Sequence, residues 1–512
     1  MSILKFILIF LEVLVLFNLL IFVHELGHFL AAKWRGLKID RFAIWFGKPI
    51  WKKKINGVEY AMGTIPFGGY VSLPQMATME MIEGKGESSG QPLPPISPMD
   101  KIIVAFAGPL FSFLLALGFA MVVWVIGRPV SKEDDSTTIG WVENRFSIRD
   151  KQGNMLSPEF FQTAEEAQAF AKSHGLKEGT CEIGGSPAWE AGLRPGDKIL
   201  EIDNHPVTHF GGQSADSITW RIVASEDRTI KIKYLRDKEE HETEAVPIHQ
   251  RKKWYERKDL RHLMIGAVQK AVIYEVATNS PAAMAGLRKG DEIVKVNGEK
   301  IYSFASVNQL QSSMTNGPIQ PVMLTIRRGE EEFERTISPE KPIKPAKSPP
   351  SFGIVGWQGN TNVSLVHPKP LAMIRESAGQ IFSTIGVIFS HKSDIGVQQL
   401  GGTVMIVRLY ATLFDSDNGW RLVIWYSVMI NVNLALLNLL PFPVLDGGHI
   451  TLALIEAIRR RPVSARLLQY LQTGCAALLI GFMLYITFFD TGDWIRSARE
   501  NHEEPLVFAP KH

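Results

Sequence analysis

Cysteine is nearly absent from this chain: Cys181 and Cys475 are the two cysteines among 512 residues. They could form one disulfide at most, and we expect none because Cys475 lies in an apolar run, so a disulfide-stapled fold is excluded. An excess of charge of one sign is also lacking, since the formal net charge is only +3. Without a strongly basic field, no nucleic-acid partner is expected. The length predicts several domains rather than one core.

Long apolar runs, by contrast, are present at four places, and 46% of the residues are hydrophobic. The runs at 6–32 and 102–126 exceed the ~20 residues that a helix needs to cross a bilayer. Those at 424–440 and 476–489 are shorter, but tryptophan and tyrosine at their ends suit the membrane interface. We therefore predict four membrane-spanning helices. A cleaved signal peptide is the alternative for the N-terminus, and it is disfavoured because only Lys5 precedes the first run while four basic residues follow it closely.

Basic residues cluster in two of the connecting segments. One cluster follows the first apolar run, at 33–54, and the other follows the third, at 459–466. Because basic loops stay in the cytoplasm, both segments are predicted to be cytoplasmic. Both termini and the long segment 128–420 then lie on the opposite side of the membrane.

The long segment repeats itself, since "SPAWEAGLRPGDKILEIDNHPV" from Ser186 returns as "SPAAMAGLRKGDEIVKVNGEKI" from Ser280. Each copy reads as a short helix, a Gly-Asp turn and a half-buried strand. The pattern resembles PDZ domains, which bind extended peptide ends by adding a strand to a sheet edge. A passive role as a spacer or shield is the alternative. Residues 143–177 have no counterpart in the second copy and are interpreted as an insertion. Three hydrophobic-glycine-hydrophobic stretches compete for two peptide-binding loops, and their assignment stays open: Ile139-Gly140-Trp141, Ile265-Gly266-Ala267 and Phe352-Gly353-Ile354.

The motif HELGH ends the first apolar run and places three ionisable residues there: His24, Glu25 and His28. On a helix, residues four apart share a face, so the two histidines can grip one metal ion. Glu25 is then placed to take a proton from water activated by the metal. Ionisable groups are costly in hydrocarbon and are therefore expected to be functional. A polar packing cluster or a proton relay is the alternative.

A hydrolytic zinc site needs a third protein ligand, and the best candidate is Asp446 in "NLLPFPVLDGGH". Pro441 and Pro443 are expected to break the helix there, and irregular backbone at membrane depth is tolerated where protein or a water-filled cavity surrounds it. His449 is the rival ligand. Two further acidic residues near the far ends of the apolar runs are interpreted as structural: Glu12 and Asp490.

HELGH in the first span, LDGG after NLLPFP and the paired PDZ-like repeats together resemble the site-2 protease family of intramembrane zinc metalloproteases, in particular the RseP type of Gram-negative inner membranes. The resemblance covers nearly the whole chain. It implies that zinc is bound by His24, His28 and Asp446, with Glu25 as the general base. It also implies two groups of substrate-binding residues, one around LDGG and one in a membrane-embedded β-hairpin: Asn433, Asn438, Pro441 and Pro443, and Phe67, Gly68, Gly69 and Tyr70. Two positions depart from the family pattern, with Ser112 in place of asparagine in GPxxN and Thr403 in place of proline after Gly402.

The resulting prediction is a multi-pass α-helical membrane protein with four transmembrane helices, a membrane-embedded β-hairpin and two inserted α+β PDZ domains. The predicted order is a first span with HExxH (1–35), a loop with the hairpin (36–100), a second span (101–128), two PDZ domains (129–252 and 253–340), a linker with interfacial helices (341–419), a third span with LDG (420–448), a basic loop (449–469) and a fourth span with a tail (470–512).

The function implied by the resemblance is regulated intramembrane proteolysis in a bacterial inner membrane. The expected substrates are single-span proteins already trimmed on the far side, such as an anti-sigma factor, or remnant signal peptides. The PDZ pair would exclude bulky substrates, the active site would lie near the cytoplasmic side, and membrane lipid and a monomeric state are expected. Two other classes compete: a non-catalytic peptide receptor with structural zinc, and a metal transporter, which should carry ligands at several depths.

Overall fold

The computed structural model spans 512 residues. It describes residues 3–76, 96–131, 135–176, 180–212, 214–250, 255–315, 318–346, 348–358, 363–390, 393–416, 418–461, 463, 465–500 and 504–510. The chain divides into two compact units. Unit 1 consists of Met1–Pro129, Leu365–Phe382 and Gly401–Asp490, and unit 2 consists of Val130–Ser364, Ser383–Leu400 and Thr491–His512.

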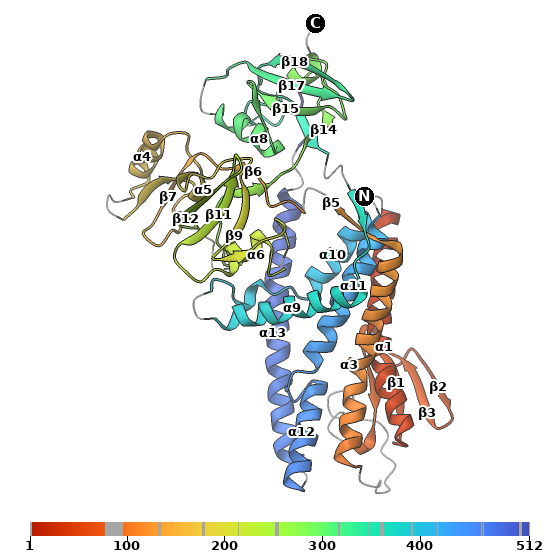
Figure 1. Ribbon diagram of the computed structural model, residues 1–512. Helices are drawn as coiled ribbons and strands as arrows, with labels where there is room; N and C mark the ends of the chain where they lie inside the picture. Colours follow the sequence, from red (N-terminus) through yellow and green to blue (C-terminus); the bar gives the residue numbers. More distant parts are fainter. Residues whose placement is uncertain are drawn as a thin grey trace. The chain divides into compact units, whose positions relative to one another are not determined.

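The helices of unit 1 confirm the four expected apolar spans. The long helices are α1 (Ile3–Trp34), α3 (Pro98–Ile126), α11 (Gly419–Asn438) and α13 (Ala465–Glu500), whose last turns belong to unit 2 (Figure 1). Each contains a stretch long and apolar enough to cross a membrane. Ser97 caps α3 by accepting a hydrogen bond from the Asp100 N–H, with Pro98 opening the first turn. Hydrophobic length thus predicts these elements correctly.

The close packing of α1 on α3 depends on glycine. A Cβ atom at Gly27 would lie 2.4 Å from the Ala107 carbonyl oxygen, so any other residue there would push the helices apart. The shorter helices α9 (Pro370–Phe389) and α10 (Thr403–Asp415) follow where interfacial helices were predicted. On α9, Met373 and Ile374 pack with Val428 of α11 in one buried cluster.

The residues of the predicted hairpin form a single edge strand of a four-stranded sheet, which is a correction to the expected fold. The strands are β1 (Arg41–Phe46), β2 (Trp51–Ile55), β3 (Val58–Met62) and β4 (Ile65–Ser72), in the order β2-β3-β1-β4. Strand β1 pairs parallel with β3 and antiparallel with β4. Phe42 of β1 packs edge-on against Phe29 of α1, with the ring centroids 5.4 Å apart. Because β1 pairs with strands that follow it only after intervening chain, the local sequence around β4 predicts only part of this sheet.

The expected break after the third span is confirmed. Helix α11 ends at Asn438, and α12 (Asp446–Arg459) begins at the proposed ligand. The prolines of residues 439–445 cannot continue a helix, which explains the interruption. The predicted basic loop at 449–469 is largely helical, because α12 continues to Arg459 and α13 starts at Ala465. Apolar residues at helical spacing after Asp446 account for the extra helix.

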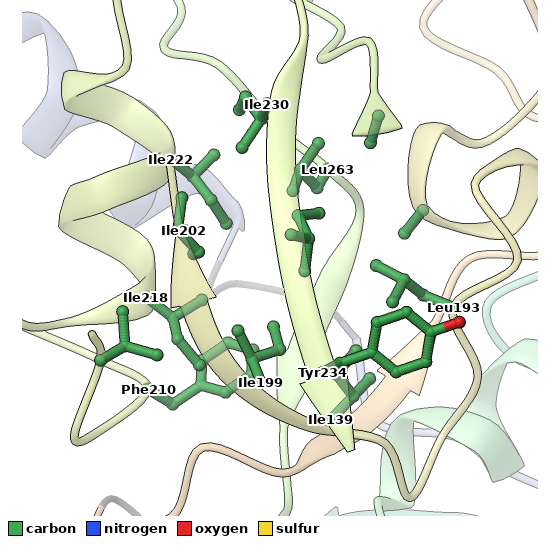
Figure 2. Packing of buried hydrophobic residues seen from close by; sticks show 14 of the residues in the cluster. Ile139, Leu193, Ile199, Ile202, Phe210, Ile218, Ile222, Ile230, Tyr234 and Leu263 are labelled. Atoms are coloured by element: carbon green, nitrogen blue, oxygen red, sulfur yellow. The ribbon is translucent and has the colours of Figure 1, made fainter. Parts of the chain in front are cut away.

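Unit 2 contains two modules that match the sequence repeat. The first module contains β6 (Ile139–Val142), α5 (Pro187–Glu190), β9 (Lys198–Ile202), β10 (His205–Pro206), α6 (Ile218–Ala224), β11 (Ile230–Arg236), β12 (Glu239–Ala245) and β13 (Ile265–Ala267). The second contains β14 (Ala271–Val276), α7 (Pro281–Met284), β15 (Glu292–Val296), β16 (Glu299–Lys300), α8 (Phe304–Ser313), β17 (Val322–Arg328), β18 (Glu331–Ile337) and β19 (Ile354–Trp357). Figure 2 shows the core of the first module, in which Ile199, Ile202 and Ile230 are fully buried.

The Gly-Asp pair of each repeat has a structural explanation. Asp197 and Asp291 are almost completely buried. Each accepts two hydrogen bonds of 2.7 Å from an arginine on a later strand, Arg236 in the first module and Arg328 in the second. A buried carboxylate needs such a bidentate partner. The same ion pair therefore closes both modules.

The structure shows which two of the three hydrophobic-glycine-hydrophobic stretches occupy equivalent positions in the two modules. The Ala188 N–H donates to the Leu263 carbonyl at 3.1 Å, and the Ala282 N–H donates to the Phe352 carbonyl at 2.9 Å, so residues 263–267 and 352–357 are equivalent. Strand β13 pairs with β6, as β19 pairs with β14. Gly140 therefore lies in β6, the strand that pairs with β13, and not in the closing strand itself.

The predicted module boundaries at 252 and 340 are too early. Strands β13 and β19 complete the two modules beyond these positions. A connecting segment separates each closing strand from the preceding strand of its module. Strand periodicity alone could therefore not assign the closing strand to that module. The insertion in the first module forms β7 (Phe146–Arg149), α4 (Ala164–Ser173) and β8 (Glu182–Gly185), with Ile148 and Phe161 in its own small core. Two further strands, β5 (Arg128–Ser131) and β20 (Val363–Val366), pair with each other.

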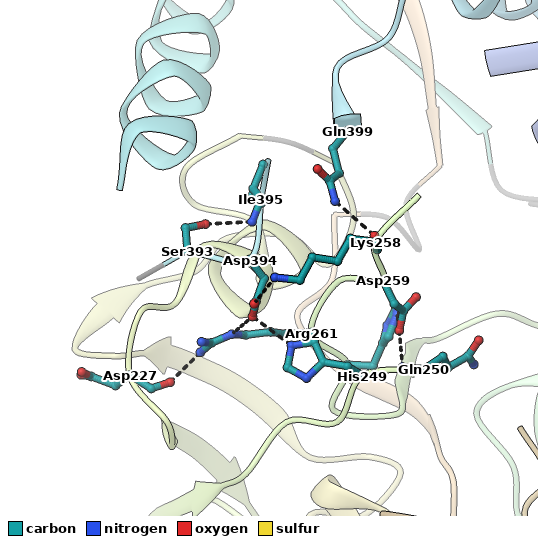
Figure 3. Close-up of polar contacts among 11 residues, drawn as sticks. Asp227, His249, Gln250, Lys258, Asp259, Arg261, Ser393, Asp394, Ile395 and Gln399 are labelled. Carbon is teal, nitrogen blue, oxygen red and sulfur yellow. Dashed lines mark hydrogen bonds and ion pairs between the residues drawn. The ribbon is translucent and has the colours of Figure 1, made fainter. Parts of the chain in front are cut away.

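The segment Ser383–Leu400 is fastened to the first module by Asp394 (Figure 3). Its carboxylate contacts Arg261 Nε at 2.8 Å, His249 Nε2 at 2.9 Å and Lys258 Nζ at 3.0 Å. Burial by itself would raise the pKa of Asp394, but hydrogen bonds from these basic side chains hold its pKa well below the usual range. The Asp394 carboxylate thus forms ion pairs with three basic side chains of unit 2.

Candidate metal centre

The residues of HELGH and LDGG meet inside unit 1. His24 Nε2 lies 3.2 Å from Asp446 Oδ2, and His28 Nε2 lies 3.3 Å from Asp446 Oδ1. The two Nε2 atoms are 3.3 Å apart. All three side chains are buried. Among the residues that the structure describes, these three form the one group of histidine, cysteine and acidic side chains arranged to hold a metal ion.

Helix α3 orients both imidazoles. His28 Nδ1 lies 2.8 Å from the Val104 carbonyl oxygen, and because a carbonyl only accepts, Nδ1 carries the proton and donates it. His24 Nδ1 lies 3.0 Å from the fully buried Ser112 hydroxyl. With Nδ1 protonated, the Nε2 of His28 presents a bare lone pair to the centre. Such outer partners fix the tautomer and ring orientation of metal-binding histidines.

The arrangement fits a tetrahedral cation. Metal–ligand distances of about 2.0–2.2 Å give tetrahedral edges of about 3.3–3.6 Å. The two Nε2 atoms are 3.3 Å apart, and each lies 3.2 or 3.3 Å from one of the two Asp446 carboxylate oxygens, which is close to such an edge. Asp446 Oδ2 is buried and has no hydrogen-bond partner within the described ranges. Imidazole lone pairs and a carboxylate that converge without a shared donor repel one another unless a cation lies between them. Two nitrogens and one oxygen suit zinc and leave a position for water or substrate.

Glycines allow the surrounding backbone to reach this centre. A Cβ atom at Gly108 would lie 2.2 Å from His28 Nε2, and one at Gly69 would lie 3.0 Å from Glu25 Cγ. Strand β4 therefore runs directly against the half-buried Glu25. The glycines after Asp446 are equally constrained, since a Cβ at Gly447 would lie 2.1 Å from the Leu439 carbonyl oxygen.

The predicted substrate-binding residues fall into two groups by position. Asn438 reaches the centre, with Nδ2 3.4 Å from His24 Nε2. Pro441 is exposed and Pro443 half-buried in the turn that carries Asp446. Asn433 lies more than one helical turn before Asn438 on α11 and is half-buried. Within the described residues, no contact links it to His24, His28 or Asp446.

Gly68 and Gly69 lie on β4, and Phe67 contributes its backbone to the same strand. Gly68 has a φ of +78°, which favours glycine, and its Cβ position is filled by the ring of Phe46. Tyr70 is not brought to the centre. Its hydroxyl accepts a hydrogen bond of 3.1 Å from Arg41, and its ring stacks on Phe46.

The remaining candidates have other surroundings. His449 is buried but lies outside the group of converging ligand atoms, so the rival ligand is not supported. Asp490 Oδ2 accepts hydrogen bonds from the Gly402 and Met405 N–H groups, which caps α10 and agrees with a structural role. Sequence reasoning missed Val104, because a backbone carbonyl leaves no residue-type signal. Gly108 and Ser112 belong to the GPxxN-like motif, whose sequence alone does not reveal their contacts with the imidazoles.

A comparison with known families decides the classification. The sequence profile of peptidase family M50 matches residues 12–482. The chain belongs to peptidase family M50. Relatives of this M50 peptidase match it almost end to end. A provisionally named zinc metalloprotease of Xylella fastidiosa is 26% identical over 490 residues, covering 92% of this chain and 96% of the relative.

Two further relatives carry more specific names. Protease RseP of Yersinia pestis is 26% identical over 501 residues, covering 93% of this M50 peptidase and 97% of the relative. The Regulator of sigma E protease of Haemophilus influenzae is 25% identical over 485 residues, covering 92% and 96%. The matches therefore include the apolar helices and both modules, not the metal centre alone.

Proposed function

We propose that this M50 peptidase hydrolyses peptide bonds inside transmembrane segments, with His24, His28 and Asp446 holding the metal and Glu25 as general base. The chain is a zinc metalloendopeptidase of the site-2 protease type. The observation that carries the proposal is the convergence of three ligand atoms beside Glu25 within a helix apolar enough to cross a membrane.

The chemistry divides between the metal and the chain. Bound zinc supplies Lewis-acid activation of the peptide carbonyl and of water. Glu25 accepts the proton of the attacking water and can return it to the leaving nitrogen. Val104 and Ser112 keep the imidazoles oriented toward the centre. The Asn438 amide, close to His24, is placed to hold the substrate backbone.

An extended substrate segment fits the free edge of β4. This strand is an edge of its sheet, and it passes Glu25 at Gly69. A transmembrane helix must unwind before cleavage, because its carbonyls are already paired. The edge of β4 offers replacement hydrogen bonds to the unwound segment. The substrates that suit such a site are single-span proteins whose far-side domain has been removed, as with an anti-sigma factor, or remnant signal peptides.

The two modules act as PDZ-type filters that exclude bulky substrates. They lie on the far side of a bacterial inner membrane, and both termini lie on that same side. In the second module, the Phe352 N–H already donates to Gln311 Oε1 at 3.1 Å. The Trp357 indole donates to Asn308 Oδ1 at 3.2 Å across the same interval between β19 and α8. Because these groups are taken, exclusion of bulky substrates is a better fit for this module than capture of a peptide end.

The experiment compares Glu25→Gln with wild type in native membranes, using a tagged single-span substrate that lacks its far-side domain. The matched control is Glu12→Gln, the same change at an exposed position of the same helix. We expect product from wild type and Glu12→Gln, none from Glu25→Gln, and loss of all product with a zinc chelator.

Zinc content of each purified variant separates binding from catalysis. Glu25→Gln should retain zinc, whereas Asp446→Ala should lose most of it because one of three ligands is removed. Product from Glu25→Gln at the wild-type rate would contradict the assigned base. It would instead support a peptide receptor with structural zinc, with cleavage by another enzyme.

A further inference from the structure

The segment 46–57, which contains the edge strand β2, is exposed along its whole length. It reads FGKPIWKKKING and combines four lysines with large apolar side chains. Ile50 is 61% exposed, Trp51 53% and Ile55 44%. We call these residues the basic edge. It is the opposite edge of the sheet from β4, which contacts Glu25.

Within the described residues, no ion pair joins a lysine of the basic edge to an acid, although Lys54 lies opposite Glu59 in the pairing of β2 with β3. The four lysines are Lys48, Lys52, Lys53 and Lys54. Other basic residues of unit 1, such as Arg41 and Lys101, do form ion pairs. Arg41 contacts Glu59 at 2.6 Å, and Lys101 contacts Glu456 at 2.6 Å. Four positive charges thus lie on one exposed segment without an ion pair to a described acidic residue.

Edge lysines are often a protection against strand pairing between molecules. That reading does not account for the tryptophan and isoleucines on the same strand, since exposed apolar side chains favour association. Lysine beside tryptophan is instead the combination found at a membrane interface. There the indole lies at headgroup depth, and the lysine stem packs on apolar surface while its ammonium reaches the phosphates.

The place of the sheet supports this reading. Its core face packs on α1 through Phe22, Phe29 and Phe42. Glu25, which β4 touches, lies about 14 Å before the C-terminal end of α1 at a rise of ~1.5 Å per residue. Figure 1 shows β2 on the side of the sheet away from α1. One edge of the sheet therefore reaches the interior of the span, while the other faces outward with its lysines.

We propose that the basic edge binds the headgroups of anionic phospholipids in the leaflet at the C-terminal end of α1. Ammonium groups pair with lipid phosphates, and Trp51 and Ile55 enter the boundary with the acyl chains. Bound lipid holds the outer edge of the sheet and so steadies β4 against Glu25. Charge complementarity combined with exposed apolar side chains favours lipid over an acidic protein or a nucleic acid, which would bind the charge but leave the apolar side chains in water.

The test uses the full-length chain in vesicles and a label beside the lysines. Cys181 and Cys475 are replaced by serine, and Pro49→Cys provides one site for a fluorophore at an exposed position. Quenching by brominated phosphatidylglycerol is compared with quenching by brominated phosphatidylcholine at equal mole fraction. Anionic lipid contributes about fivefold per lysine near the surface, so we expect clear enrichment of phosphatidylglycerol around the label.

The variant Lys52→Gln/Lys53→Gln/Lys54→Gln should reduce the two quenching efficiencies to parity. The matching arginine triple variant should keep the preference, because charge is retained. The control removes three exposed lysines of unit 2 in the same way, Lys198, Lys295 and Lys341, and should behave as wild type. Raising the salt concentration should weaken the preference for phosphatidylglycerol when the lysines are unchanged. This tests the electrostatic contribution without substituting a lysine.

Equal quenching by both lipids in the labelled protein that keeps its lysines would overturn the proposal. The exposed lysines would then be interpreted as a binding site for an acidic protein. A preference that persists in the glutamine variant would also overturn it, because the lysines would then not be its source. Labelling of the thiol introduced by Pro49→Cys with a membrane-impermeant reagent, applied from each side, confirms that the variant keeps its orientation. The readout involves no cleavage, so its failure is distinct from a failure of the proposed protease mechanism.

Discussion

Replacing Gly108 by alanine should disable the metal centre while leaving the fold in place. The added Cβ would lie 2.2 Å from His28 Nε2 and 2.9 Å from His24 Nε2. Non-bonded heavy atoms rest at about 3.5 Å, so the His28 ring must move by roughly 1.3 Å. That ring is held by the Val104 carbonyl on the same helix, and it cannot move without losing this hydrogen bond.

The size of the effect follows from this displacement. Misplacing a reacting group by about 1 Å can cost ~100-fold in rate. Loss of the orienting hydrogen bond costs a further 10–100-fold in metal affinity, as is typical for the outer partners of metal-binding histidines. We therefore expect zinc content well below one ion per chain and a cleavage rate lower by about 100-fold or more.

The assay measures zinc content by mass spectrometry of the purified protein and cleavage of the single-span substrate in vesicles. Gly118→Ala is the matched control, because it is the same change on the same helix and its Cβ would meet nothing within 4 Å. Alanine in place of a helical glycine should stabilise the control by about 0.5–1 kcal/mol. Full zinc content and wild-type activity in Gly108→Ala would refute the reasoning.

Three further changes have defined outcomes. Ser112→Ala removes the 3.0 Å contact to His24 Nδ1 and should weaken zinc binding by about 10–100-fold, measured by chelator competition; unchanged affinity would show that Ser112 does not orient His24. Asp490→Ala removes the cap of α10 and should lower the unfolding free energy by about 1 kcal/mol, measured by thermal unfolding, with cleavage chemistry intact. Asp394→Ala leaves Arg261, His249 and Lys258 without their carboxylate and should cost about 2 kcal/mol in unit 2. Because the pKa of Asp394 is depressed in the folded chain, its contribution is complete above the unfolded value of about 3.9 and is lost as the pH falls below it. Wild type and Asp394→Ala should therefore differ in stability at pH 7 and converge in strong acid, and a constant difference would contradict this assignment.

The features that the sequence predicted correctly depend on short-range patterns. Apolar length predicted the four spanning helices, and the prolines after Leu440 predicted the break that starts α12 at Asp446. The repeated Gly-Asp motif predicted a repeated module, and its aspartates are buried in the same ion pair in both copies. Each of these signals is complete within a few neighbouring residues.

Other features were mispredicted or missed because their partners are far apart along the chain. The closing strands β13 and β19 were assigned outside their modules, and β1 was not recognised as the centre of a four-stranded sheet. Tyr70 follows Gly69, which lies against Glu25, yet strand alternation turns its side chain away to Arg41. Sequence position identified the strand but not which of its residues would face the centre.

By itself, the sequence determined that His24 and His28 lie on one face of a helix, because residues four apart share a helical face whatever surrounds them. Only the tertiary structure decided that Asp446 lies against both histidines and His449 does not, since that depends on where α12 begins relative to α1. Only the structure showed that Val104 and Ser112 of α3 orient the imidazoles. Helical periodicity is fixed by local bonding, whereas the convergence of side chains from three helices is decided by how those helices pack.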